Sequence, residues 1–110
     1  MKKTVYIAGA VTGEDFDHCF YKFMKAEKHL KDKGYEVINP MKEERKIKLT
    51  AKMMKTPFDV DSWGGIMIIL LAKLYKKADS IYMLQDWQSS QGAKIEKIFA
   101  ERCGKEVMYE

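Results

Sequence analysis

The segment from Lys3 to Ala8 constrains the fold more than any other part of the chain. It is a nearly continuous run of β-branched, aromatic and apolar residues (Thr-Val-Tyr-Ile-Ala after the lysine), without the polar alternation of a half-exposed strand. Such runs are typical of strands in parallel sheets, which helices cover on both faces. Segments with helical spacing must therefore alternate with strands along the rest of the chain.

This alternation continues to the C-terminus. Apolar spacing and capping residues predict helices at about residues 15–33, 62–77 and 90–103, and apolar runs predict strands at 3–8, 35–38, 80–84 and 106–109. Residues 41–61 carry dense charge, and we expect one short helix there at most. The pattern predicts an α/β fold: a small doubly wound, flavodoxin- or Rossmann-like parallel sheet of about four to five strands with helices on both faces.

Composition places the chain among ordinary globular proteins. With 110 residues, 46% hydrophobic and 33% charged, we expect a single domain over residues 1–110. The net charge of +4 is mild, and we interpret it as solvation, although the lysine-rich residues 42–55 leave a nucleic-acid-binding arm as an alternative.

Location is predicted from the absence of targeting patterns and from the cysteines. No signal peptide precedes the first strand, and the apolar residues 66–72 are too few to span a bilayer, so we expect a buried helix there and no membrane partner. Cys19 and Cys103 lack metal-ligand spacing. We expect reduced, buried thiols in a cytoplasmic protein, with neither metal nor cofactor.

Two segments at strand ends form a candidate small-molecule site. The first strand ends in Gly9-Ala10-Val11-Thr12-Gly13, a turn of small residues that a ligand can approach closely. The strand at 80–84 leads into a helix for which Ser90 is a plausible N-cap, and Gly92 and Glu96 share one face of that helix. Ligands of open α/β sheets bind at the carboxyl ends of the strands, so we expect Glu96 to face the glycine turn.

The chemistry of Glu96 has two interpretations at this point. A carboxylate beside a glycine can attack the anomeric carbon of a bound sugar and form a glycosyl–enzyme intermediate. Spacing alone favours a solvated helix glutamate. Trp63 and Trp87 likewise fit core packing as well as stacking on a base.

Three motifs in order resemble the nucleoside 2-deoxyribosyltransferase-like superfamily, in particular its small single-domain branch of phages and bacteria, the uncharacterised DUF4406 type. They are Tyr-Ile-Ala-Gly-Ala-Val-Thr-Gly at residues 6–13, Gly-Tyr-Glu-Val-Ile-Asn-Pro at 34–40 and Trp-Gln-Ser-Ser-Gln-Gly-Ala-Lys-Ile-Glu at 87–96. The match spans almost the whole chain. The resemblance implies cleavage of the N-glycosidic bond of a deoxynucleoside or its monophosphate, by a protein that forms homodimers.

The resemblance also implies roles for individual residues. Glu96 is in the position of the nucleophile, and Tyr6 in that of the residue that orients it, although a buried strand tyrosine with a satisfied hydroxyl explains Tyr6 equally well. Ser90, six residues before the glutamate, suits a 5′-phosphate because it donates a hydrogen bond without adding negative charge. The remaining residues expected at the substrate are Gly9, Ala10, Gly13, Gly92 and Trp87.

Two departures from the superfamily pattern matter. Ala10 replaces a proline, which loosens the turn. Leu71 stands where the superfamily has an aspartate that serves in proton transfer, and loss of general-acid assistance lowers a rate by about two to four orders of magnitude. The alternative function is therefore a non-catalytic nucleotide-binding or sequestering protein on the same fold.

Overall fold

A computed structural model describes residues 2–43, 46 and 62–110. In this part of the chain strands and helices alternate, and the bounds agree with those expected from the sequence to within about two residues. Residues 40–43 are also helical. The elements are β1 (Thr4–Ala8), α1 (Phe16–Asp32), β2 (Glu36–Ile38), α3 (Trp63–Lys77), β3 (Ser80–Met83), a 3-10 turn η1 (Trp87–Ser89), α4 (Gln91–Arg102) and β4 (Glu106–Tyr109).

The four described strands form one parallel sheet in the order β2-β1-β3-β4. Strand β1 is central, and its Tyr6 lies level with Ile38 of β2 and Ile81 of β3. The chain first moves from β1 to β2 and then crosses back over β1 to β3, so the direction of winding reverses between β1 and β3. Such a reversal opens a crevice at the carboxyl ends of the two strands.

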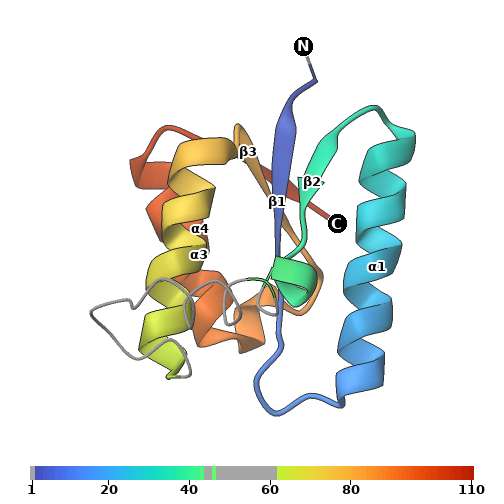
Figure 1. Cartoon of the computed structure of the whole chain (residues 1–110), viewed down its shortest axis with the longest axis vertical. Helices are drawn as coiled ribbons and strands as arrows, with labels where there is room; N and C mark the ends of the chain where they lie inside the picture. Colours follow the sequence, from blue (N-terminus) through green and yellow to red (C-terminus); the bar gives the residue numbers. More distant parts are fainter. Residues whose placement is uncertain (1, 44–45, 47–61) are drawn as a thin grey trace.

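Helices cover both faces of the sheet, with α1 on one side and α3 and α4 on the other (Figure 1). Side chains of β1 alternate between the two layers, as the pleat of a strand requires. Val5 and Ile7 pack with Phe23 of α1, whereas Tyr6 and Ala8 pack with the core under α3 and α4. The predicted doubly wound α/β fold is confirmed.

The helix starts follow from local sequence. Asp15, Ser62 and Ser90 are N-caps, and each accepts a hydrogen bond from a backbone N–H three residues further on, a standard way to satisfy the first turn of a helix.

Two expectations need correction. The apolar segment 66–72 lies in α3 but is only half buried: Met67 and Leu70 face the sheet, while Ile68 is 55% exposed. A helix that covers one face of a sheet buries only one of its own sides, so its outer side stays exposed in the single chain. Cys19 is buried as expected, whereas Cys103 is half buried; both thiols are free. Within the segment 41–61, residues 44–45 and 47–61 lie outside the described residues, and so do the features predicted for them.

Candidate functional site

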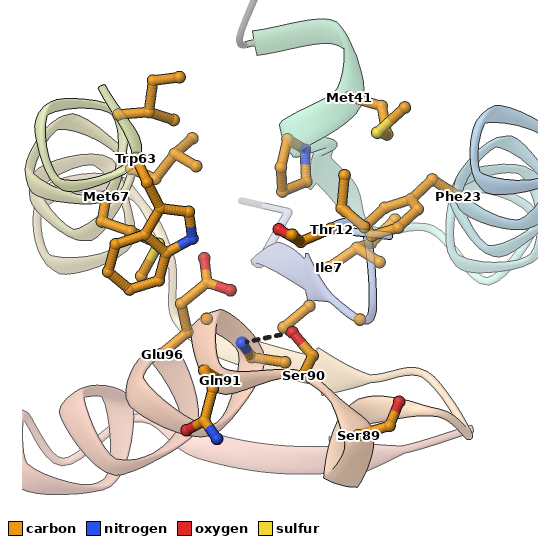
Figure 2. Close-up of a pocket in the computed structure, with 18 residues that line it drawn as sticks. Ile7, Thr12, Phe23, Met41, Trp63, Met67, Ser89, Ser90, Gln91 and Glu96 are labelled. Carbon is orange, nitrogen blue, oxygen red and sulfur yellow. Dashed lines mark hydrogen bonds between the residues drawn. The ribbon is translucent and has the colours of Figure 1, made fainter. Parts of the chain in front are cut away.

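A cavity of about 520 Å³ opens at the carboxyl end of β1, at the point where the winding reverses. Side chains from β1, α1, α3, α4 and the loops between them surround it (Figure 2). Most of its wall is apolar, and polar groups gather at the start of α4. Its lining comprises Ile7, Ala8, Gly9, Val11, Thr12, Phe23, Pro40, Met41, Trp63, Ile66, Met67, Leu70, Ser89, Ser90, Gln91, Gly92, Ala93 and Glu96.

Glu96 is the one charged side chain among these lining residues, and its carboxyl group points into the space beside Trp63 (Figure 2). The residue is only 6% exposed. The hydroxyl of Tyr6, which is fully buried on β1, donates a hydrogen bond to Oε2 of Glu96. The expected solvated alternative for Glu96 is therefore wrong, and the expected pairing of Tyr6 with Glu96 is present.

Burial controls the ionisation of this pair. It raises the pKa of Glu96 from 4.5 to about 7, while the hydrogen bond from Tyr6 acts in the opposite direction. Burial and the neighbouring carboxylate raise the pKa of Tyr6 well above its usual value, so the phenol keeps its proton and acts as the donor. A carboxyl group that titrates near neutral pH is typical of groups used in acid, base or nucleophilic chemistry.

The start of α4 supplies the polar end of the cavity. Ser90 accepts a hydrogen bond from the backbone N–H of Ala93 at 3.1 Å and keeps its own hydroxyl proton for another acceptor (Figure 2). Gly92 and Glu96 lie one turn apart and both face the cavity, as their spacing predicts. A side chain at position 92 would enter the cavity, because its Cβ would lie 3.6 Å from Sδ of Met67 and 3.8 Å from Cζ2 of Trp63.

Gly9 lines the cavity, as expected, and it also lies close to the end of β3. A Cβ at this position would lie 2.7 Å from Cδ1 of Leu84, on β3's side of the turn. The glycine therefore permits close packing between the ends of β1 and β3. The backbone N–H of Leu84 also donates to Ala8 O at 2.8 Å.

Three residues expected at the substrate do not line the cavity. Trp87 packs on the core beneath α4 and contacts Lys97 and Tyr109, so its ring is turned away. Gly13 is exposed in the turn, where its positive φ of 82° favours glycine. Ala10 is buried, and its backbone N–H and carbonyl oxygen bind the side chains of Asp86 and Lys22. Sequence spacing placed these residues in the right segments but did not fix their directions.

Leu71 is half buried against the core on the α3 and α4 side and provides no polar group. The other buried carboxylate described, Glu27, lies elsewhere and is bound by Asn39, Lys31 and Lys42. Burial alone would raise its pKa, but these hydrogen bonds outweigh burial and lower it. Glu27 therefore has the properties of a structural ion-pair residue, in contrast with Glu96.

Several residues of the site were missed by sequence reasoning. Phe23 and Met67 line opposite walls, and both looked like ordinary apolar positions of amphipathic helices. Lys22 and Asp86 bind the turn after β1 from two distant elements. Apolar spacing predicts that Phe23 faces the sheet, but no sequence signal pairs Lys22 with a residue 64 positions away.

The fold and the cavity define a doubly wound α/β domain with a crevice at the carboxyl ends of its strands, where such sheets usually bind ligands. The chain belongs to the family described as a domain of unknown function (DUF4406), which it matches over residues 3–109. No curated protein and no solved structure matches the chain.

Two further properties concern the described residues only. Every helix among them is too short or too polar to cross a lipid bilayer. No group of three or more His, Cys, Asp or Glu side chains among them is arranged to hold a metal ion.

Proposed function

We propose that this protein cleaves the N-glycosidic bond of a (deoxy)nucleoside 5′-monophosphate, with Glu96 as the nucleophile. The observation that carries the proposal is the Glu96 carboxyl group, which is buried, bound by Tyr6 and directed into a largely apolar cavity. A cavity of about 520 Å³ has the size of a small-molecule site, and its apolar walls suit a heterocyclic base. The resemblance to the deoxyribosyltransferase-like superfamily supports the same reaction.

In this reaction a carboxylate oxygen of Glu96 attacks C1′ of the sugar as the C1′–N bond breaks. The base leaves with the bonding electron pair and takes a proton from water, and a glycosyl ester of Glu96 remains. Attack by water at C1′, with loss of a proton to solvent, releases the sugar and regenerates the carboxylate; a second base in place of water gives transfer. Tyr6 orients the attacking carboxylate.

The cavity wall supplies separate regions for the parts of the ligand. Trp63 and Met67 on one side and Phe23 on the other are large, polarisable surfaces for a flat ring. The hydroxyl of Ser90 and the backbone N–H groups at the start of α4 suit a phosphate, because a helix N-terminus favours negative charge. Under this proposal the ligand is a cytoplasmic nucleotide.

The test is incubation with a panel of deoxynucleoside 5′-monophosphates and the corresponding nucleosides, followed by chromatography for the free base. Release of base by the wild type and its loss in Glu96→Gln support the proposal. Glu27→Gln is the matched control, because it removes a second buried carboxylate outside the cavity. No release from any substrate, or equal release by Glu96→Gln, refutes the enzymatic function.

The second candidate is a nucleotide-binding or sequestering protein without turnover. It is favoured by Leu71 at the position of the superfamily's proton-transfer carboxylate and by the lack of a second carboxylate among the described lining residues. A nucleotide then raises the melting temperature of both wild type and Glu96→Gln without release of base.

We also propose that the protein forms a homodimer. The support is a set of exposed apolar side chains on the outer surfaces of the adjacent helices α3 and α4: Ile68, Tyr75, Ile95 and Ile98 are each 40–59% exposed. Light scattering in solution that gives the 12.8 kDa mass of one chain at all concentrations refutes this proposal.

A further inference from the structure

The turn after β1 is held by side chains rather than by backbone pairing at Ala10. The Ala10 N–H donates to Oδ1 of Asp86 at 3.0 Å, and Ala10 O accepts from Nζ of Lys22 at 2.8 Å. Lys22 and Asp86 also form an ion pair with each other. A buried backbone group needs a hydrogen-bond partner. At Ala10 the two members of the ion pair provide these partners, Asp86 for the N–H and Lys22 for the carbonyl oxygen.

Asp86 also connects this turn to the start of α4, which forms another part of the cavity wall. Its backbone O accepts the N–H of Ser89 at 3.1 Å and the hydroxyl of Ser89 at 2.8 Å, and the next turn brings Ser90 to the cavity. The side chain of Asp86 therefore fixes the wall of Gly9 and Thr12, while its main chain fixes the wall of Ser89 and Ser90. Neither Lys22 nor Asp86 lines the cavity itself.

Lys22 links the ion pair to helix α1, which forms a third part of the cavity wall. It lies next to Phe23, the α1 residue in the cavity wall, and its ammonium group is 5.7 Å from the centre of that ring. The side chains of Lys22 and Asp86 are only 14% and 30% exposed, so water screens the pair weakly. Burial would raise the pKa of Asp86, but the bonds from Lys22 and Ala10 outweigh it and lower the pKa, so Asp86 is ionised at neutral pH.

From these contacts we infer that Lys22 and Asp86 are positioning residues of the cavity: by holding the Ala10 peptide they set the spacing between the β1 turn and the start of α4. A proline at position 10 would have no N–H for Asp86 to bind, whereas Ala10 has one. The ion pair of Lys22 and Asp86 therefore holds this turn, as a proline ring would otherwise do. The Ala10 turn, which the sequence predicts to be looser, is thus held by the side chains of Lys22 and Asp86. The consequence for nucleotide binding rests on the proposed function; the consequence for the cavity does not.

Two measurements test the inference on Asp86→Leu, which removes the charge and the acceptor. The first is the titration of the Glu96 carboxyl by carbon NMR without ligand: a loosened turn admits water, so we expect the pKa of Glu96 to fall from about 7 by about one pH unit. The second is the calorimetric affinity for deoxycytidine and deoxyadenosine 5′-monophosphates, which we expect to weaken about tenfold or more.

Matched variants separate positioning from simple loss of a salt bridge. Asp86→Asn keeps an acceptor for the Ala10 N–H and should restore most of both properties. Lys22→Met should shift them in the same direction as Asp86→Leu, and the Lys22–Asp86 double mutant should be non-additive. Lys28 and Asp32 form an exposed ion pair on the same helix, and Lys28→Met should change neither property.

A folded Asp86→Leu protein with an unchanged Glu96 titration refutes the inference, whatever the ligand. If Asp86→Leu does not fold, Lys22→Met carries the same test, because it removes the bond from Lys22 to Ala10 O and keeps the bond from the Ala10 N–H to Asp86. A folded Lys22→Met protein with an unchanged Glu96 titration then refutes the inference. A wild-type protein that binds neither nucleotide refutes the proposed function but leaves the Glu96 titration as the test of positioning.

Discussion

Replacing Glu96 with glutamine should make the protein more stable at alkaline pH, because ionisation of this buried carboxyl group opposes folding. The pKa of Glu96 is about 7 in the folded protein, against an ordinary value of 4.5. As pH rises between these values the unfolded chain loses its proton first, so the free energy of unfolding falls. The interval of about 2.5 pH units, at about 1.36 kcal/mol per unit, corresponds to about 3 kcal/mol.

The expected result is a difference between wild type and Glu96→Gln that depends on pH. Below about pH 4.5 the carboxyl is protonated in both states and resembles glutamine in shape, so the two proteins should be similar in stability. Above about pH 8 the variant should be more stable by about 3 kcal/mol, with a melting temperature higher by on the order of 10 °C. Urea unfolding at a series of pH values and constant ionic strength measures this difference.

Glu27→Gln provides a control of opposite sign. The pKa of Glu27 is lowered in the folded protein, so its contribution to stability is present above its ordinary pKa of 4.5 and is lost as pH falls through the folded value. This variant should therefore be less stable than wild type at neutral pH. A stability difference for Glu96→Gln that is flat from about pH 5 to 8, or that favours wild type at high pH, refutes the reasoning about Glu96.

Three further substitutions test the site. Tyr6→Phe removes the hydrogen bond that lowers the pKa of Glu96, so that pKa should rise by about one to two pH units in an NMR titration; an unchanged value contradicts the pairing. Gly9→Ala should cost about 1–3 kcal/mol in urea unfolding, because its Cβ would clash with the Leu84 side chain. An equal cost in a Leu84→Ala background would exclude the contact with Cδ1 of Leu84 as the cause. Gly92→Leu places a side chain in the cavity and should lower nucleotide affinity more than about tenfold by calorimetry. The melting temperature of this variant should stay the same or rise, because leucine favours a helix more than glycine does. An unchanged affinity would mean that the ligand binds elsewhere.

The elements and their order were predictable because their signals are local. The apolar run at β1 predicts a strand covered on both sides, and the caps Asp15, Ser62 and Ser90 mark helix starts through bonds that span only three residues. The placement of Glu96 at the carboxyl ends of the strands followed from the order of elements alone. The shared face of Gly92 and Glu96 followed from the helical repeat.

Directions of side chains in loops were not predictable in the same way. Trp87 belongs to the motif that carries Glu96, yet the 3-10 turn η1 directs its ring onto the core. Phe23 and Met67 come from helices on opposite sides of the sheet and meet only at the cavity. Their common location depends on how each helix packs, which no local pattern specifies.

By itself the sequence determined the alternating elements, the parallel sheet and the position of a glutamate beside a glycine turn, because periodicity and capping act over a few residues. Tertiary structure alone decided that this glutamate is buried and bound by Tyr6. Tyr6 and Glu96 lie 90 residues apart, and packing of α4 on β1 removes water from the carboxyl and joins it to the phenol. The same packing brings Lys22 and Asp86 to one peptide, because long-range contacts depend on how complete layers fit together.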